Sequence, residues 1–132
     1  MISFMKKAAR RIFRNDRDDI AKLEPKYREI ASAIRGKKLT YLSGNKLVSI
    51  VETCEDIEAN NLDGYFLEAG CALGGSAILI TKLKNQSRQF NVYDVFEIIP
   101  APTDEDGEDV QKRYEKISSG KSRGIGGDKY YG

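Results

Sequence analysis

The sequence predicts an α/β fold in which helices precede one βαβ unit. Apolar residues recur at helical spacing between positions 47 and 57. A short apolar run at 65–67 leads into a glycine-rich turn at 70–75, and a second apolar run follows at 90–96. The order strand, turn, helix, strand is a βαβ unit with parallel strands and a right-handed crossover. Parallel sheets normally have more strands, so we expect an incomplete α/β fold.

The first part of the chain predicts a basic helical extension. Residues 1–38 carry a net charge of +7 and residues 39–132 a net charge of −5, and we place a domain boundary between them. A short helix is expected over 3–14 and a second between Pro25 and Gly36. We expect both helices to be solvated on one face and to dock on the body or on a second subunit, which makes a homo-oligomer an expectation.

The body opens with an amphipathic helix over 46–60, which Ser43 or Asn45 is placed to cap. Cys54 lies on its apolar stripe, so we expect core packing rather than chemistry from this thiol. A second helix is expected over 76–84, between the two predicted strands.

The segment after the second strand changes in composition. Pro100 and Pro102 open a loop, and acidic residues crowd positions 104–109. Their spacing is not that of a calcium-binding EF-hand, so we expect a solvated loop and no metal ligands. A brief helix over 110–117 precedes a glycine-rich end at 118–132.

Composition excludes several classes of function. The chain has 132 residues and no His, which removes Ser-His and Cys-His nucleophile pairs and HExxH zinc sites. No run approaches the ~20 apolar residues of a membrane span, and no interleaved aromatic pattern suggests nucleic-acid binding. Two cysteines and a charged N-terminus without a secretory signal predict a cytoplasmic location with free thiols.

The turn between the predicted strands carries the strongest functional signal. Gly70 sits at the end of the first strand, and Gly74 and Gly75 open the next helix, where backbone N–H groups face a ligand. Asp94 follows at the carboxyl end of the second strand, where an acid accepts ribose hydroxyls. The pattern therefore predicts an adenosine-type nucleoside at the carboxyl edge of the sheet.

Two residues discriminate between nucleosides. Ala72 stands where a dinucleotide fingerprint has its middle glycine, which weighs against NAD or FAD without excluding them. Glu68, just before the turn, would repel a pyrophosphate and suits a positive or donor-bearing ligand such as S-adenosylmethionine. A Walker A loop is absent.

The chain resembles the macrocin O-methyltransferase family over about residues 40–132. The segments that carry the resemblance are FLEAGCALGGSA, VYDVFEIIPAP and DGEDV. The family contains class I enzymes with a Rossmann-like fold, which use S-adenosylmethionine to methylate sugar hydroxyls of natural products. The resemblance implies that a cofactor would be held by Glu68, Gly70, Gly74, Gly75, Ser76, Asp94 and Phe96. Asp94 would bind the ribose, and Phe96 would border the adenine.

The resemblance also implies what this sequence lacks. The family's catalytic base and magnesium-binding aspartates lie on later strands, so no catalytic or metal residue is assigned here. We therefore expect the N-terminal portion of an O-methyltransferase for a sugar-bearing acceptor, carrying part of a cofactor site. Two alternatives stay open: a fragment of a nicotinamide-binding oxidoreductase, and a non-enzymatic interaction module that uses the basic arm.

Overall fold

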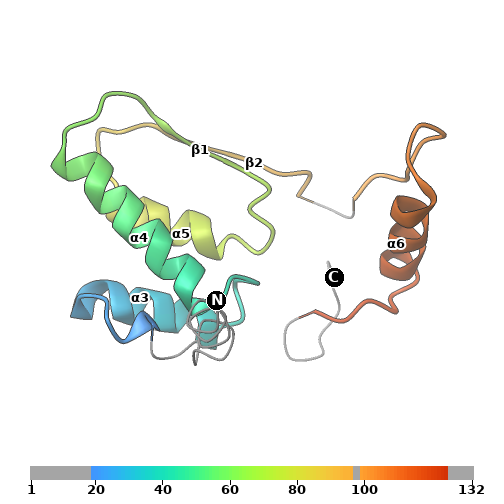
Figure 1. The fold of residues 1–132 in the computed structure, drawn as a ribbon, viewed down its shortest axis with the longest axis horizontal. Coiled ribbons are helices and arrows are strands. Elements are labelled where there is room, and N and C mark those ends of the chain that lie inside the picture. Colours follow the sequence, from blue (N-terminus) through green and yellow to red (C-terminus); the bar gives the residue numbers. More distant parts are fainter. Residues whose placement is uncertain (1–18, 97–98, 125–132) are drawn as a thin grey trace, which may run out of the picture.

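A computed structural model describes residues 19–96 and 99–124, which form helices and a small two-stranded sheet (Figure 1). The helices are α3 (Pro25–Gly36), α4 (Gly44–Ala59), α5 (Gly75–Leu83) and α6 (Glu108–Ser118), and the strands are β1 (Phe66–Ala69) and β2 (Phe90–Tyr93). The helix expected over 3–14 and the chain beyond 124 lie outside the described residues. No helix in the described part is long and apolar enough to cross a membrane.

The two strands form a parallel pair, as predicted. Phe66 is opposite Phe90, and Ala69 is opposite Tyr93. The connection between the strands contains α5, so the described residues hold one βαβ unit. The helices and this small parallel sheet are compatible with the predicted incomplete α/β fold.

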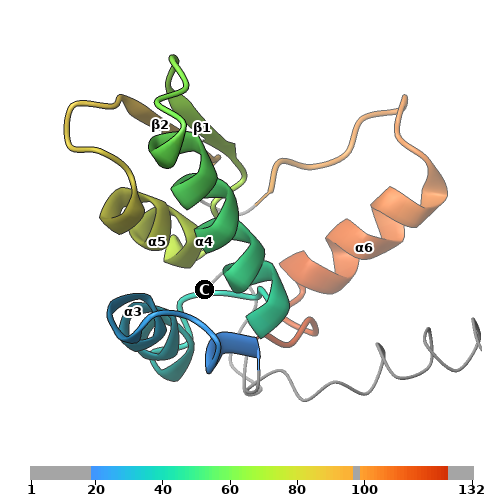
Figure 2. The ribbon, with the colours of Figure 1, turned by 60° about the vertical axis from the view of Figure 1, so that its left-hand side comes forward.

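Three helices share the hydrophobic core. Ala31 from α3, Leu47 from α4 and Leu79 from α5 are fully buried. Figure 2 shows α4 and α5 side by side, with α3 beneath them. Helix α3 thus docks on the body, as expected. Cys54 is 6% exposed, which confirms its predicted place in the interior.

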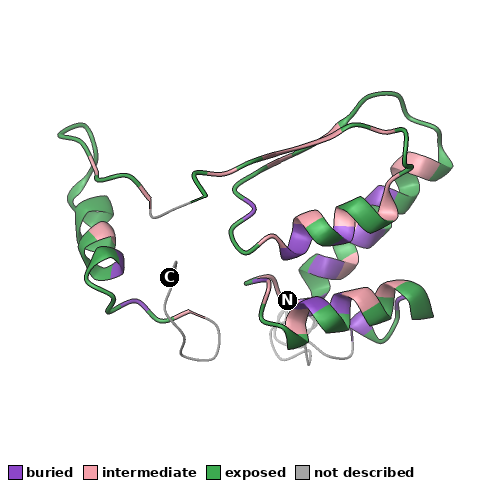
Figure 3. Ribbon diagram, turned by 180° about the vertical axis from the view of Figure 1, so that it is seen from behind, coloured by how far each residue is buried: buried purple, intermediate pink, exposed green. Residues whose placement is uncertain are grey.

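The two faces of the sheet differ in their cover. On the face that carries Phe66 and Val92, the side chains are half-buried. On the opposite face Leu67 is 54% exposed and Tyr93 is 56% exposed. Figure 3 shows the buried residues concentrated in the helices rather than along the strands, and α6 stands apart from α3, α4 and α5.

Three details of the prediction need correction. Strand β2 ends at Tyr93 rather than running to residue 96, because the Asp94 side chain accepts a hydrogen bond from the N–H of Phe96 and turns the chain. Helix α4 begins at Gly44, two residues early. Ser43 occupies the N-cap position without a side-chain cap, because its hydroxyl donates to Asn45 instead.

An ion pair fixes the far end of the βαβ unit. Arg88, which precedes β2, donates from Nε to Glu58 Oε1 of α4 at 2.6 Å and from Nη1 to the carbonyl oxygen of Gly64 at 3.0 Å. Its guanidinium also lies 5.2 Å from the centre of the Phe66 ring. These contacts tie the amino ends of both strands to the end of α4.

Candidate functional site

The glycine turn joins β1 to α5 at the carboxyl edge of the sheet. The N–H of Gly70 donates to the carbonyl oxygen of Tyr93 at 2.7 Å, which extends the strand pairing into the turn. Gly70 has a φ of 84° and Gly74 a φ of 78°, both in the left-handed region. A Cβ at either position would meet nothing within 4 Å. These two glycines are therefore required by backbone conformation and face open space.

Gly75 has a different role from the one expected. Its N–H donates to the carbonyl oxygen of Leu39 at 2.8 Å, so this amide does not face a ligand. A Cβ there would lie 2.4 Å from that oxygen and 2.7 Å from Cγ2 of Ile34. Gly75 is thus the point where the start of α5 packs against the end of α3. Sequence analysis missed Leu39, because no local pattern marks a contact across 36 residues.

Asp94 lies directly after β2, at the same edge as the turn. Its Oδ2 accepts the N–H of Ala72 at 2.9 Å, and its Oδ1 accepts the N–H of Phe96 at 3.1 Å. Hydrogen bonds from the backbone of Phe96 and then of Ala72 hold the pKa of this carboxyl below its usual range. Asp94 is therefore a carboxylate at neutral pH, as the predicted ribose contact requires.

Glu68 projects from β1 toward the start of α5. The hydroxyl of Ser76, the second residue of that helix, donates to Glu68 Oε1. The other oxygen, Oε2, is buried and has no hydrogen-bond partner among the described residues. A buried acceptor without a donor is unfavourable by about 1–3 kcal/mol. Oε2 of Glu68 can therefore accept a hydrogen bond that the described residues do not supply.

Cys71 and Ala72 complete the turn. Cys71 is 8% exposed, and burial, followed by the charges of Asp94 and Glu68, raises the pKa of its thiol. This thiol is protonated at neutral pH, which agrees with its predicted role as a small turn residue. Ala72 has a φ of 49°, which alanine rarely adopts, and its N–H is a contact that sequence analysis missed.

The structure joins some of the predicted site residues by hydrogen bonds and leaves others without a hydrogen bond to the rest. Glu68 pairs with Ser76, and Asp94 lies beside the turn and Phe96. The Phe96 side chain is 71% exposed at the border of the site. Among residues 19–96 and 99–124, no group of three or more His, Cys, Asp and Glu could hold a metal ion. The acidic residues at 104–109 are all exposed.

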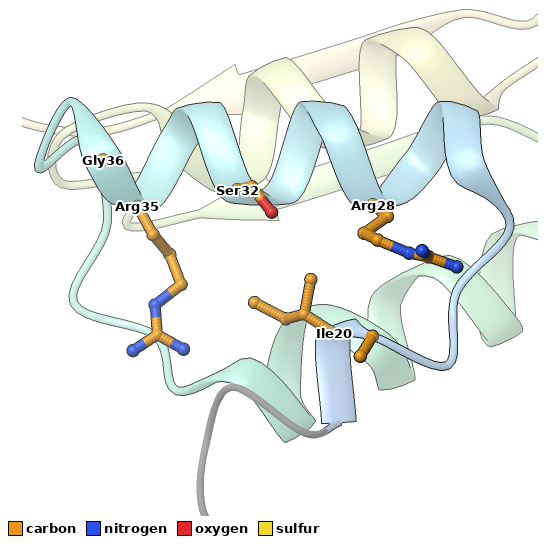
Figure 4. A pocket seen from close by; sticks show the side chains of 6 residues that line it. Ile20, Arg28, Ser32, Arg35 and Gly36 are labelled. Atoms are coloured by element: carbon orange, nitrogen blue, oxygen red, sulfur yellow. The ribbon is translucent and has the colours of Figure 1, made fainter.

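The described part also has hollows away from the predicted site, and two of them are defined by their lining residues. One of about 530 Å³ is flanked by Arg28 and Arg35 of α3, with Ile20 between them (Figure 4). Arg28 donates to the carbonyl oxygen of Leu23 at 2.9 Å. The other, about 310 Å³, lies between α4, α5 and β1 and is mostly apolar. Neither hollow is lined by a residue of the predicted site.

Comparisons with known proteins identify the family. Searches of curated proteins and of solved structures each gave no significant match. The model of one family, described as macrocin-O-methyltransferase (TylF), matches residues 3–123. The match includes the region before residue 40, which the motif resemblance did not cover. The chain therefore belongs to the macrocin O-methyltransferase (TylF) family.

Proposed function

We propose that this chain binds S-adenosylmethionine at the carboxyl edge of its sheet, for transfer of a methyl group to a hydroxyl of a sugar-bearing small molecule. Membership of a methyltransferase family supports the reaction class. The observation that carries the choice of cofactor is the buried Oε2 of Glu68, which lacks a donor among the described residues. A ligand with an amino group or another donor would satisfy it.

The backbone of the turn supports the same choice over a dinucleotide. A pyrophosphate needs free N–H groups at such a turn. Here the N–H of Ala72 is bonded to Asp94, that of Gly74 to the carbonyl oxygen of Cys71, and that of Gly75 to the carbonyl oxygen of Leu39. With three amides used internally and two carboxylates nearby, the turn favours donors and positive charge.

The residues present divide the binding between them. Glu68 would accept from the amino acid part of the cofactor, Asp94 from the ribose hydroxyls, and the open space at Gly70 and Gly74 would admit the ligand close to the backbone. The bound cofactor supplies an electrophilic methyl group. This chain's part is to orient it, and no described residue is assigned as the base. The described residues do not fit a Mg²⁺ site, so no step is derived through that ion.

Calorimetric titration with S-adenosylhomocysteine tests the proposal. We expect binding by the full chain and about tenfold weaker binding by Glu68→Gln, because a charge-assisted hydrogen bond is lost while Ser76 keeps its acceptor. Glu105→Gln, which removes an exposed carboxylate on the later loop, is the matched control and should bind as the wild type does. Tighter binding of NADH than of S-adenosylhomocysteine, or an unchanged affinity in Glu68→Gln, would overturn the proposal.

A further inference from the structure

Asp94 connects two loops that are distant in sequence. Ala72 belongs to the turn after β1, and Phe96 belongs to the segment after β2, 24 residues later. The carboxylate accepts one N–H from each, at 2.9 Å on Oδ2 and 3.1 Å on Oδ1. The loops that border the proposed cofactor site are therefore joined through one side chain.

Both donors have an unusual backbone conformation. Ala72 has a φ of 49° and Phe96 a φ of 55°, in the left-handed region that residues with a Cβ rarely occupy. Such conformations persist where the surroundings impose them. Here the shared surrounding is the Asp94 carboxylate, because each left-handed residue presents its N–H to one of the two oxygens.

The same carboxylate keeps capacity for a ligand. A carboxylate has about four acceptor positions, two on each oxygen. The backbone N–H of Phe96 uses one position on Oδ1, and that of Ala72 uses one on Oδ2. The thiol of Cys71 and the backbone N–H of Val95 also help to lower the pKa of the Asp94 carboxyl, as weaker hydrogen-bond donors. The Ala72 and Phe96 bonds therefore leave one acceptor position on each oxygen, and the two hydroxyls of a vicinal diol would compete for these positions with the weaker Cys71 and Val95 donors.

We propose that Asp94 is a positioning residue as well as a ligand contact: it holds the loops after β1 and β2 in their binding shape before the ligand arrives, and then receives the two ribose hydroxyls. The second half rests on the proposed function, whereas the first half concerns the ligand-free protein. Affinity gains from such preorganisation, because the loops need not be ordered on binding.

Amide hydrogen exchange of the ligand-free full chain, followed by NMR, tests the first half. In Asp94→Ala we expect the amides of Ala72 and Phe96 to exchange at least about tenfold faster, because their acceptor is gone. The amide of Gly75, bonded to Leu39 on the other side of the turn, should keep its rate and so reports that the fold is intact. Asp94→Asn, which keeps one acceptor oxygen, should affect one of the two amides more than the other. Unchanged exchange at both amides in both variants would overturn the proposal.

A second measurement separates positioning from direct contact. If Asp94 only touches the hydroxyls, wild type and Asp94→Asn will bind the 2′,3′-dideoxy analogue of S-adenosylhomocysteine equally. Positioning predicts that wild type still binds this analogue at least about fivefold more tightly, because its loops are already ordered. Equal affinities would refute positioning. Failure of wild type to bind S-adenosylhomocysteine at all would instead contradict the proposed function, and the exchange result would still stand.

Discussion

Gly74 and Gly75 are neighbours in the chain, yet they lie on opposite sides of the turn. Gly75 faces the core, where Leu39, Ile34 and Thr40 leave no space for a Cβ. Gly74 faces open space and is required only by its left-handed φ. The same residue type thus serves packing at one position and backbone shape at the next. A glycine in a glycine-rich motif therefore need not contact a ligand, because packing or backbone conformation alone can require it.

The largest effect is expected for Gly75→Ala. The new Cβ would lie 2.4 Å from the Leu39 carbonyl oxygen and 2.8 Å from the Thr40 Cβ, so α5 must shift away from α3. Overpacking against backbone should lower the free energy of unfolding by about 3 kcal/mol. Urea denaturation measures this change.

Gly36→Ala is the matched control for that substitution. Its Cβ would meet nothing within 4 Å, and Gly36 is the last residue of α3, so this variant should be as stable as wild type or slightly more so. Equal stability of Gly36→Ala and Gly75→Ala would show that the two sides of the turn do not differ as described.

A smaller loss is expected for Gly74→Ala. Space is open there, and the penalty is the left-handed conformation, about 1–2 kcal/mol. Gly120→Ala shares the positive φ and the open space, at a position away from the turn. Both variants should lose similar stability in urea, whereas only Gly74→Ala should weaken binding of S-adenosylhomocysteine. An equal loss of affinity in Gly120→Ala would mean that the effect of Gly74→Ala on binding is not specific to the proposed site.

Ala72→Gly should act in the opposite direction. Glycine adopts a φ of 49° without the steric penalty of a Cβ, although it also increases the entropy of the unfolded chain. The net effect should be a small gain in stability, about 0.5 kcal/mol, visible as a higher midpoint in thermal denaturation. A clear loss of stability would indicate that the Ala72 methyl group packs in the turn.

These contrasts explain which parts of the fold and of the candidate site could be predicted from the sequence. The apolar spacing that places Leu47 and Cys54 inside the protein is local, and the strand, turn and helix around Gly70 have local signals as well. The contact between Gly75 and Leu39 depends on how α3 packs, which no spacing reveals. The left-handed conformation of Ala72 was equally hidden, because alanine is not a residue that signals it.

The smallest effect is expected for the contribution of Asp94 to the free energy of unfolding, and this contribution depends on pH. Backbone N–H groups of Phe96 and Ala72 lower the pKa of its carboxyl in the folded protein. Its contribution to stability is therefore fully present above the pKa of the unfolded state and is lost as pH falls through the lower, folded pKa. The pKa of Glu58 is also lowered, chiefly by its hydrogen bond from Arg88, so wild type alone mixes two titrations.

Comparison of variants isolates the Asp94 contribution. Wild type and Asp94→Asn should differ most in urea-unfolding stability near neutral pH, and their curves should approach each other below about pH 4, where aspartate is protonated in the unfolded chain. Glu58→Gln should change the same curve through the Arg88 contact and leave the Asp94-dependent part in place. A constant difference between wild type and Asp94→Asn at every pH would mean that the charge of Asp94 does not hold the two loops. The left-handed conformations of Ala72 and Phe96 would then need another cause.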